Sequence, residues 1–487
     1  MTSMQRQKDQ LWASLYLPDL QLDDINSDNA LAVVERCNHR QQIRCCNVPA
    51  RQSGIYPSMT LNSAYALLPD LTVVEYNEQI EQNLLYRIGK WAMQFSSIVS
   101  VHEPNHILIE IAGSKKLFEG FSTLVHLIEE GLSKLGYNSQ IGIAPTPLAA
   151  NLLARANIRL GITDRQRLKV AISQLPVSLL ELPKDTIDGL SRSGMHQIGN
   201  VADVSPASLT RRFGCACVDY FDRLLGRHPD PRTPLRLGRT FEREFHLIQE
   251  IQDISALQFA TQRMINELAA FLIAQDKGIN TFQFSLHHEK HQSTELQLRF
   301  LQATSQARHL HQVLTERLAQ VELVAPVCGL HLFADTFSDV DRDAADFFVK
   351  SRQQQKSLGE VIDQLCSRLG KEALYTLTTV DDHRPEKAWK KSFIDLPSDS
   401  AGDWPSRPLW LLKQPLQMQS DYHTVDSSAE RIETGWWEAS DVRRDYFLIQ
   451  DNNGTRYWAF RNRSQARDQT NNRSPRSNTV FIHGIFA

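Results

Sequence analysis

Hydrophobic and polar positions change their spacing along the chain, and each spacing predicts a different type of element. Residues 107–111 form an apolar run interrupted only by Glu110, which is typical of a central strand covered on both faces. Residues 11–17, LWASLYL, predict a strand that pairs with it, and residues 32–47 predict a hairpin. Residues 82–97 have apolar positions at helical spacing. The first part of the chain is therefore expected to mix helices and strands.

The pattern changes twice further along the chain. Residues 175–226 predict several short helices separated by glycine-containing turns, and the proline-rich residues 228–239 predict a linker. The next hundred residues predict a β-α-β-β-α-β order, with elements at 241–251, 254–274, 280–288, 294–301, 305–319 and 321–334. A helix follows within 357–375, and two strands flank an expected turn at Asp451–Gly454.

Composition changes this picture little. The chain has 487 residues, 41% hydrophobic, 22% charged and 8% aromatic, as expected for several globular domains. Its net charge of −3 gives no overall attraction to nucleic acid, so such contacts need local patches or backbone donors. The seven cysteines are scattered without paired CxxC spacing, which favours reduced thiols in the cytosol. Neither an apolar signal core nor a run of about 18 apolar residues is present, so no membrane contact is expected.

Residues 48–91 carry the most distinctive motif. The segment resembles the Y-family DNA polymerase pattern A-R-x-x-G-[VI], then a methionine, then A-x-x-x-x-P-x-L, through Ala50, Arg51, Gly54, Ile55, Met59, Ala64, Leu67, Pro69, Asp70 and Leu71. In that family the segment forms the small fingers domain, which closes over the nascent base pair. The resemblance continues through residues 109–113 and 140–154.

The resemblance implies an α+β multidomain fold with Y-family polymerase architecture and a small β-rich C-terminal region. Its expected parts are a palm at 1–170 with fingers inserted at about 48–75, a helical helix-hairpin-helix thumb at 171–230, a βαββαβ little finger at 231–336, a flexible segment at 337–356 and a partner-binding region at 357–487.

The positions that the family uses for metal binding are occupied by other residues. The acidic positions of the first strand fall on Ser14 and Tyr16, and those of the second motif fall on Asn105 and His106. Uncharged side chains cannot hold two Mg²⁺ ions or neutralise a triphosphate. We therefore expect no catalytic residues, no metal and no cofactor.

The family's side chains that contact the nucleotide are mostly replaced as well. The phosphate-contacting lysines fall on Pro147 and Asn151, and the fingers tyrosine falls on Val48. Arg51 alone remains as a residual nucleotide contact. An ordinary salt-bridging arginine is an equally good interpretation of Arg51.

Sequence-independent DNA binding is expected from the thumb and the little finger. Gly194 and Gly199 resemble the turn and second helix of a helix-hairpin-helix, which offers backbone N–H groups to phosphates, although packed helices with glycine caps fit the same pattern. Arg239, Arg243, Arg299 and Arg308 are candidate phosphate contacts of the little finger, and a solvated face is an equally good interpretation.

The C-terminal region narrows the resemblance. The order DHRPE, RPLWLL, IETGWW and RRDYF resembles ImuB-type proteins, Y-family relatives of the bacterial mutasome. Trp436 and Trp437 are candidates for partner docking, although a buried core is the alternative for most of the tryptophans here. Phe347 and Phe348 match the two apolar anchors of the sliding-clamp peptide Q-L-x-L-F, but its leading glutamine falls on Ala344.

The resemblance implies a noncatalytic adaptor for damage-induced mutagenesis and translesion synthesis, cytoplasmic and nucleoid-associated. It would bind DNA and recruit the sliding clamp, an error-prone C-family DNA polymerase and an ImuA-type RecA-like protein. One alternative is an active lesion-bypass polymerase with displaced metal ligands, drawn from Asp19, Asp23, Glu103 or Glu110. Another is a protein-interaction module that no longer binds DNA.

Overall fold

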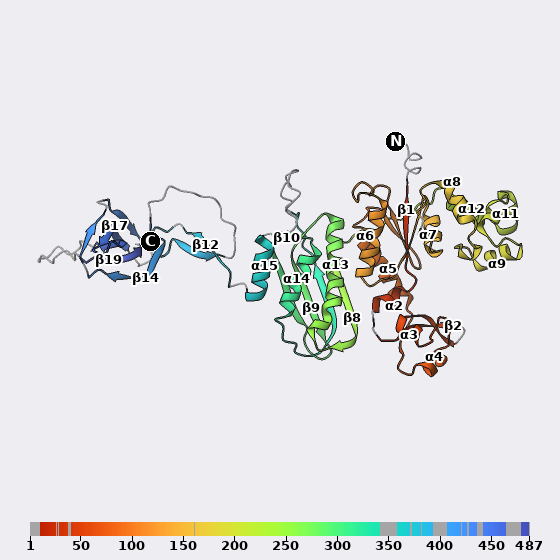
Figure 1. Cartoon of the computed structure of the whole chain (residues 1–487), viewed down its shortest axis with the longest axis horizontal. Coiled ribbons are helices and arrows are strands. Elements are labelled where there is room, and N and C mark those ends of the chain that lie inside the picture. The colour runs from red at the N-terminus through yellow and green to blue at the C-terminus, as the bar shows by residue number, and fades with distance from the viewer. Residues whose placement is uncertain are drawn as a thin grey trace. The chain divides into compact units, whose positions relative to one another are not determined.

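Two compact units make up the chain, residues 1–364 and residues 365–487. The computed structural model describes residues 10–25, 27, 29–37, 40–159, 161–340, 358–370, 373–380, 382–392, 407–419, 421–425, 428–435, 442–463 and 479–486. Figure 1 labels the elements of each unit.

The first sheet of unit 1 has four antiparallel strands in the order β5-β6-β1-β7. They are β1 (Trp12–Tyr16), β5 (Val99–His102), β6 (His106–Glu110) and β7 (Gln140–Ala144). The predicted pairing of the first strand with the apolar run is confirmed, because Ala13 lies opposite Ile109. We call this sheet and its helices the palm.

Helices cover both faces of the palm sheet, as expected for such an apolar strand (Figure 1). Ala13 and Leu15 of β1 pack with α5 (Glu78–Ala92) and α6 (Phe121–Lys134) on one face. Trp12 packs with α7 (Pro147–Arg155) on the other face. Successive strand residues point to opposite faces, so the face with Trp12 also receives the side chain of Ser14.

A three-stranded sheet follows in the order β3-β2-β4. Its elements, with the short helices around it, are α2 (Leu20–Ile25), β2 (Leu31–Cys37), β3 (Arg40–Cys46), α3 (Val48–Gln52), α4 (Leu61–Leu67) and β4 (Thr72–Glu75). The predicted hairpin is confirmed by the pairing of Ala32 with Cys46. Side chains of Asn47 and Thr60 cap the backbone N–H groups that begin α3 and α4.

Short helices then pack on the α7 side of the palm around a shared apolar core. They are α8 (Arg165–Ser173), η1 (Val177–Leu179), α9 (Lys184–Arg192), α10 (Ile198–Ala202), α11 (Pro206–Phe213) and α12 (Cys215–Leu224). We call this helical group the thumb.

The predicted β-α-β-β-α-β order is also confirmed, and we call this part the little finger. Its elements are β8 (Phe241–Ile251), η2 (Ile254–Leu257), α13 (Gln258–Gln275), β9 (Ile279–His288), β10 (Thr294–Thr304), α14 (Ala307–Leu318) and β11 (Val327–Ala334). The strands are ordered β10-β9-β11-β8, and α13 and α14 share their core. The last strand begins at Val327 rather than at residue 321, directly after Pro326, whose ring nitrogen has no ladder hydrogen to donate.

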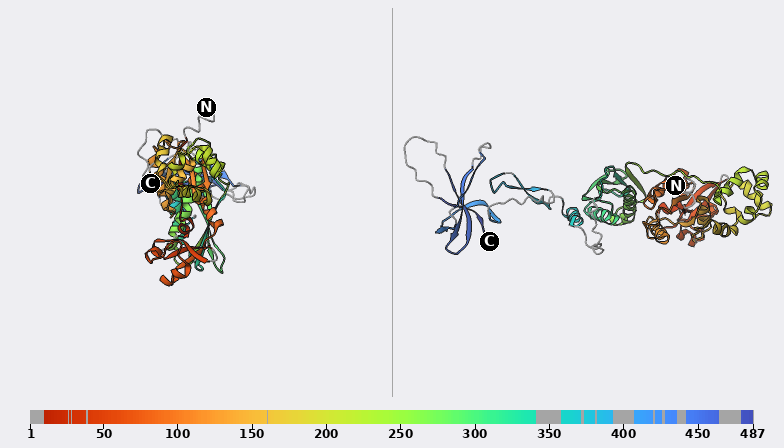
Figure 2. Two further views of the ribbon diagram at one scale, coloured as in Figure 1. Left: turned by 90° about the vertical axis from the view of Figure 1, so that its right-hand side faces the viewer. Right: turned by 90° about the horizontal axis from the view of Figure 1, so that it is seen from above.

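Unit 2 is rich in strands. The helix α15 (Leu358–Leu369) crosses the boundary between the units, and the strands are β12 (Thr376–Thr379), β13 (Trp389–Ser392), β14 (Trp410–Gln417), β15 (Tyr422–Thr424), β16 (Glu430–Thr434), β17 (Val442–Asp451), β18 (Arg456–Asn462) and β19 (Phe481–Ile485). Figure 2 shows the twist of the main sheet, ordered β14-β19-β18-β17-β15.

Two details of unit 2 bear on the predictions. The turn at Asp451–Gly454 joins β17 to β18, with Gly454 at a φ of 87° that favours glycine. Trp458 is buried, as the core interpretation expects, whereas Trp410 is 69% exposed. The expected fold class, α+β with several domains and a β-rich C-terminal region, is confirmed. Within the described residues, no helix is long and apolar enough to cross a membrane.

Candidate functional site in the palm

Three uncharged side chains meet where the acidic positions are expected. The Ser14 hydroxyl donates to Asn151 Oδ1 at 2.8 Å, and its Oγ lies 3.0 Å from His106 Nδ1. All three residues are at most 1% exposed. Because the hydroxyl hydrogen is used by Asn151, the Ser14 oxygen accepts the Nδ1–H of His106. We call Ser14, His106 and Asn151 the Ser14 network.

Burial keeps the Ser14 network uncharged. It lowers the pKa of His106 to about 3, although the nearby Glu181 carboxylate acts in the opposite direction. At neutral pH the imidazole is therefore neutral. The amide nitrogen Nδ2 of Asn151 is buried and has no hydrogen-bond partner among the described residues.

The other two predicted positions lie beside this network. Tyr16 is opposite His106 in the pairing of β1 with β6, and their rings stack with centroids 4.9 Å apart. Asn105 lies in the β5–β6 turn, where its carbonyl accepts the Leu17 N–H at 2.9 Å. The structure thus brings together all four residues that the sequence placed at the acidic positions.

A second polar group, which the sequence did not predict, adjoins the Ser14 network. Arg232 Nη1 donates to His102 Nδ1 at 2.8 Å, so the opposite nitrogen of His102 donates to Glu181 at 2.7 Å. Arg155 lies 3.9 Å from the same carboxylate. We call these residues the Glu181 cluster, which joins the β5–β6 hairpin to the thumb and to the predicted linker.

The Glu181 carboxylate already binds side chains of the protein, namely His102 and Arg155. Burial on its own raises its pKa, but the hydrogen bond from His102 and the nearby charges lower the pKa overall. Its backbone N–H donates to the Tyr220 hydroxyl at 3.1 Å. No motif signalled this residue, because its side-chain partners His102 and Arg155 lie 79 and 26 residues before it in the chain.

Among the described residues, the four acidic residues considered as displaced ligands make no hydrogen bond or ion pair with the Ser14 network. Glu110 is at the far end of β6, where it accepts backbone N–H groups of Leu11 and Ala112. Glu103 is exposed in the β5–β6 turn. Asp19 and Asp23 are one turn apart at α2, and burial raises the pKa of Asp23 to about 6, although hydrogen bonds from Asn138 lower it. The described residues contain no group of three or more His, Cys, Asp or Glu arranged to hold a metal.

Arg51 lies in a short helix of the segment that carries the motif, and the two thumb glycines lie at a turn and in the helix that follows it. Arg51 in α3 is half exposed, with Nη2 3.5 Å from Asp19 Oδ2, as the salt-bridge interpretation expects. Gly194 follows α9 at a φ of 75°, and its N–H bonds back to Ser191 as in a helix cap. A side chain at Gly199 would lie 3.0 Å from the Ser173 carbonyl oxygen, so this glycine permits close packing of α10 on α8.

Of the four little-finger arginines predicted to contact phosphate, Arg239, Arg299 and Arg308 are on the surface. Arg239 and Arg299 are exposed, and Arg299 donates to Gln297 at 2.9 Å on the open face of the sheet. Arg243 differs from the expectation of a phosphate contact. Its side chain is 10% exposed, with Nε 3.2 Å from Glu267. An arginine held in this way does not offer its charge to DNA, and we leave Arg243 out of the proposed DNA surface.

Arg243 belongs to an ion-pair group that joins the little finger to the palm. Arg263 is fully buried and donates to the Asp24 carbonyl at 2.9 Å and to its carboxylate at 2.7 Å. Arg87 lies 2.5 Å from the same carboxylate. Burial on its own raises the pKa of Asp24, but these guanidiniums lower it well below its ordinary value. We call Asp24, Arg87, Arg243, Arg263 and Glu267 the Asp24 cluster.

The candidates for partner binding, Phe347, Phe348, Trp436 and Trp437, lie outside the described residues.

Comparisons with known proteins agree with the sequence motifs. Residues 19–155 match the model of the impB/mucB/samB family. Protein ImuB of Caulobacter vibrioides (strain NA1000 / CB15N) is 26% identical over 448 residues, which cover 84% of this chain and 96% of that protein. DNA polymerase IV of Shewanella pealeana is 24% identical over 278 residues, 55% of this chain and 77% of that protein.

Solved structures also align with the chain. The insertion ternary complex of Dbh DNA polymerase does so with a TM-score of 0.38 and 14% identity, covering 68% of this chain and 99% of that chain. DinB from Sulfolobus solfataricus aligns with a TM-score of 0.37 and 14% identity, covering 67% and 98%. In sequence, the chain is thus similar to the impB/mucB/samB family at residues 19–155 and to Protein ImuB over most of its length, as its motifs indicated.

Proposed function

We propose that this chain is a noncatalytic polymerase-like adaptor in DNA damage tolerance and induced mutagenesis. It binds DNA without sequence preference and recruits an error-prone C-family DNA polymerase, an ImuA-type RecA-like protein and the sliding clamp, in the cytoplasm at the nucleoid. The similarity to ImuB and the impB/mucB/samB domain support this role.

The Ser14 network is the observation that carries the noncatalytic part of the proposal. Phosphoryl transfer by two metals needs carboxylate oxygens that hold Mg²⁺ and offset the charge of the triphosphate. Here the neutral imidazole of His106 and the amide of Asn151 each form a hydrogen bond with the Ser14 hydroxyl at the centre of the palm. The nearby Glu181 carboxylate is held by His102.

Primer extension by the full-length protein tests this conclusion. We expect no nucleotide addition on a primed template with Mg²⁺ or Mn²⁺ and all four nucleotides, under conditions where a DNA polymerase IV extends the primer. The proposal would be overturned if the parent protein extends the primer and either the Glu103→Gln variant or the double variant Asp19→Asn with Asp23→Asn does not. That result would assign a polymerase with displaced metal ligands.

DNA binding is proposed to involve Arg239, Arg299 and the hairpin that contains Gly194 and Gly199. A titration with a labelled primer–template at two salt concentrations tests it, because phosphate contacts weaken as salt rises. Absence of binding at low salt would instead support a protein-interaction module. Arg51 is proposed as a residual nucleotide contact, and its substitution by alanine should then weaken binding of a nucleoside triphosphate.

The clamp and partner contacts are proposed from sequence. Phe347→Ala with Phe348→Ala should weaken clamp binding at least tenfold in a pull-down titration, while Gln353→Ala with Gln354→Ala in the same segment leaves it unchanged. Equal clamp binding by both double variants would contradict the proposed anchors. Trp436→Ala with Trp437→Ala tests docking of the C-family polymerase and the ImuA-type protein in the same way.

A further inference from the structure

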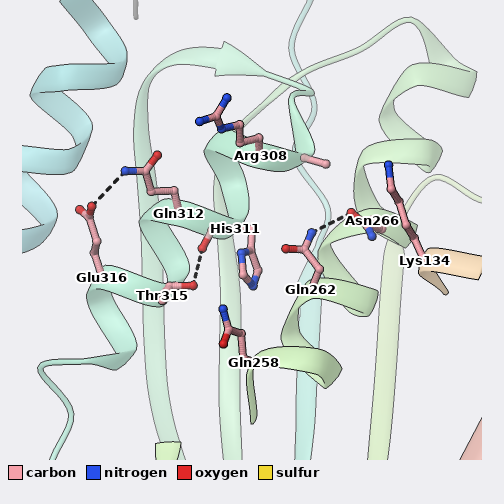
Figure 3. Close-up of a pocket in the computed structure, with 10 residues that line it drawn as sticks. Lys134, Gln258, Gln262, Asn266, Arg308, His311, Gln312, Thr315 and Glu316 are labelled. Carbon is pink, nitrogen blue, oxygen red and sulfur yellow. Dashed lines mark hydrogen bonds between the residues drawn. The ribbon is translucent and has the colours of Figure 1, made fainter. Parts of the chain in front are cut away.

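A groove of about 690 Å³ runs between α13 and α14 of the little finger (Figure 3). Most of the residues that line it have polar or charged side chains; the lining consists of Lys134, Gln258, Gln262, Asn266, Ala307, Arg308, His311, Gln312, Thr315 and Glu316. Lys134 comes from α6 of the palm, and the other residues come from the two helices. Apart from Lys134, no residue that lines the α13–α14 groove lies in the family match at residues 19–155, and none belongs to the candidate site in the palm.

Each helix contributes a row of side chains at four-residue spacing. Gln258, Gln262 and Asn266 follow one another along α13, and Arg308, Gln312 and Glu316 do so along α14. Residues four apart lie on one face of a helix and about 6 Å apart along its axis. The groove therefore has two walls with regularly spaced polar groups, as Figure 3 shows.

Amide side chains dominate these rows, and their chemistry matches that of the peptide backbone. A glutamine or asparagine offers both an N–H donor and a carbonyl acceptor, the pair that a main-chain peptide group needs. In an extended chain, peptide groups that point the same way recur every two residues, or about 6.6 Å. This repeat is close to the spacing of the rows on the groove walls.

The charges of the groove lie at its walls and not on its floor. Burial lowers the pKa of His311, whose ring lies on the floor with Nε2 3.4 Å from the Thr261 hydroxyl. Lys134 pairs with Glu130 at 2.7 Å. Arg308 is exposed, and the described residues provide it with no hydrogen-bond or ion-pair partner. Arg308 is therefore available to bind a carboxylate.

We propose that the α13–α14 groove binds an extended peptide segment of a partner protein through its main chain, and that Arg308 selects an acidic side chain of that segment. Small-molecule sites are mostly lined by apolar and aromatic side chains, whereas Ala307 is the only apolar residue among those that line this groove, and the rest of its apolar surface comes from the aliphatic parts of polar side chains. A nucleic-acid backbone fits less well, because the groove presents the Glu316 carboxylate and one of its two basic side chains is paired.

Selection from a phage-displayed library of random ten-residue peptides on the full-length protein tests the proposal. We expect enriched peptides to share an aspartate or glutamate at a fixed position. A fluorescein-labelled synthetic copy should lose at least tenfold in affinity, by anisotropy, on Gln262→Ala with Asn266→Ala and on Arg308→Glu. These residues are exposed or half-buried, so the variants should fold, which circular dichroism checks.

Matched controls change the same residue types on the opposite face of the little finger. Gln283→Ala and Arg299→Glu, both exposed in the sheet, should leave the affinity within twofold. A library without enrichment, or enriched peptides that lack a shared acidic residue or bind the groove variants as well as the parent, would overturn the proposal.

Modified peptides test whether the main chain is recognised. N-methylation of alternate peptide groups removes donors without changing side chains, and we expect it to abolish binding. Alanine in place of the uncharged side chains should have little effect. Binding that survives N-methylation but depends on apolar side chains would show a different mode of recognition and would contradict the proposal.

Discussion

At the residue scale, the members of the Ser14 network depend on one another. The hydroxyl of Ser14 donates to Asn151 and accepts from His106, and all three side chains are shielded from water. A buried polar atom that loses its partner costs the desolvation of that atom, about 1–3 kcal/mol. The network is therefore a stabilising part of the palm core.

We expect Ser14→Ala to lower the free energy of unfolding of the palm by about 1–3 kcal/mol, because it leaves the Asn151 carbonyl oxygen and the His106 N–H without partners. Urea unfolding followed by tryptophan fluorescence measures it, since Trp12 and Trp91 are buried in the palm. Ser133→Ala on the exposed side of α6 is the control and should change the unfolding midpoint little. An equal effect of both substitutions would contradict the assignment.

His106 should make the palm less stable in mild acid. Its folded pKa of about 3 lies below the unfolded value of about 6.5, so the unfolded chain binds the proton more tightly. The stability that the palm has with His106 neutral is fully present above pH 6.5 and is lost as the pH falls toward 3. Between pH 7 and pH 5 the parent should lose up to about 2 kcal/mol more than His106→Asn. Urea midpoints at the two pH values measure this, and parallel losses would contradict it.

At the element scale, the distance between β7 and α7 is set by a glycine. A side-chain carbon at Gly142 would lie 2.3 Å from both the Ala150 carbonyl oxygen and the Ala154 nitrogen. Both atoms belong to the backbone of α7 and cannot move aside without shifting the helix. Asn151 lies on this helix, so its position in the Ser14 network depends on the close approach.

Gly142→Ala should therefore destabilise the palm by about 3 kcal/mol or more, with α7 displaced from the sheet. Gly161→Ala is the matched control, because an added carbon there meets the Ile143 side chain at an ordinary 3.6 Å. Thermal unfolding of the two variants compares them. Similar melting temperatures would mean that the helix accommodates the extra carbon.

The Asp24 cluster joins α2 and α5 of the palm to β8 and α13 of the little finger. Its three guanidiniums share the Asp24 and Glu267 carboxylates, and Arg263 is fully buried. Asp24→Asn leaves Glu267 as the remaining carboxylate of this cluster, and breaking a buried pair costs about 3–5 kcal/mol. We expect the little finger to separate from the palm more readily, with faster proteolysis of the 228–239 linker.

Asp23→Asn is the control for this prediction, because it removes the neighbouring carboxylate, whose charge acts only weakly on Arg263 and which forms no hydrogen bond or ion pair with the cluster among the described residues. Burial already raises the pKa of Asp23 to about 6, so its charge is easily lost. Unfolding midpoints and linker cleavage should stay close to those of the parent. Equal cleavage of both variants would show that the Asp24 cluster does not hold the two parts together.

At the scale of the whole molecule, charge limits how DNA can be bound. The net charge is −3, and the open face of the little-finger sheet presents Glu242, Glu244 and Glu295 beside Arg299. We expect a shallow dependence of DNA affinity on salt, and Arg239→Ala should reduce the logarithmic slope by about 1. Arg431→Ala in unit 2, where Arg431 pairs with Asp445, should leave the slope unchanged. Titrations across a salt series measure both slopes.

Periodicity predicted much of this fold. The palm strands, the β-α-β-β-α-β order and the turn at Asp451–Gly454 were all evident, because each element has a strong local pattern. The last little-finger strand was predicted to begin six residues too early. The apolar residues before Pro326 are compatible with a strand, but the proline prevents them from continuing the ladder.

The site was predicted in part. Alignment of motifs assigned Ser14, Tyr16, Asn105 and His106 to the acidic positions, and in the structure Tyr16 lies opposite His106, which bonds to Ser14. The Glu181 and Asp24 clusters could not be predicted, because their members come from distant segments and pair through side chains that carry no local motif. Arg243 resembled any exposed arginine in sequence, and only its three-dimensional partners distinguish it.

The burial of the Ser14 network also bears on how such a protein evolves. An aspartate introduced at position 14 would be fully buried between a neutral imidazole and an amide, without a cation to balance its charge. That single substitution would destabilise the palm, so a stable carboxylate at this position would require several simultaneous changes. Single mutational steps toward a charged core are therefore disfavoured, whereas substitutions on the exposed surfaces meet no such barrier.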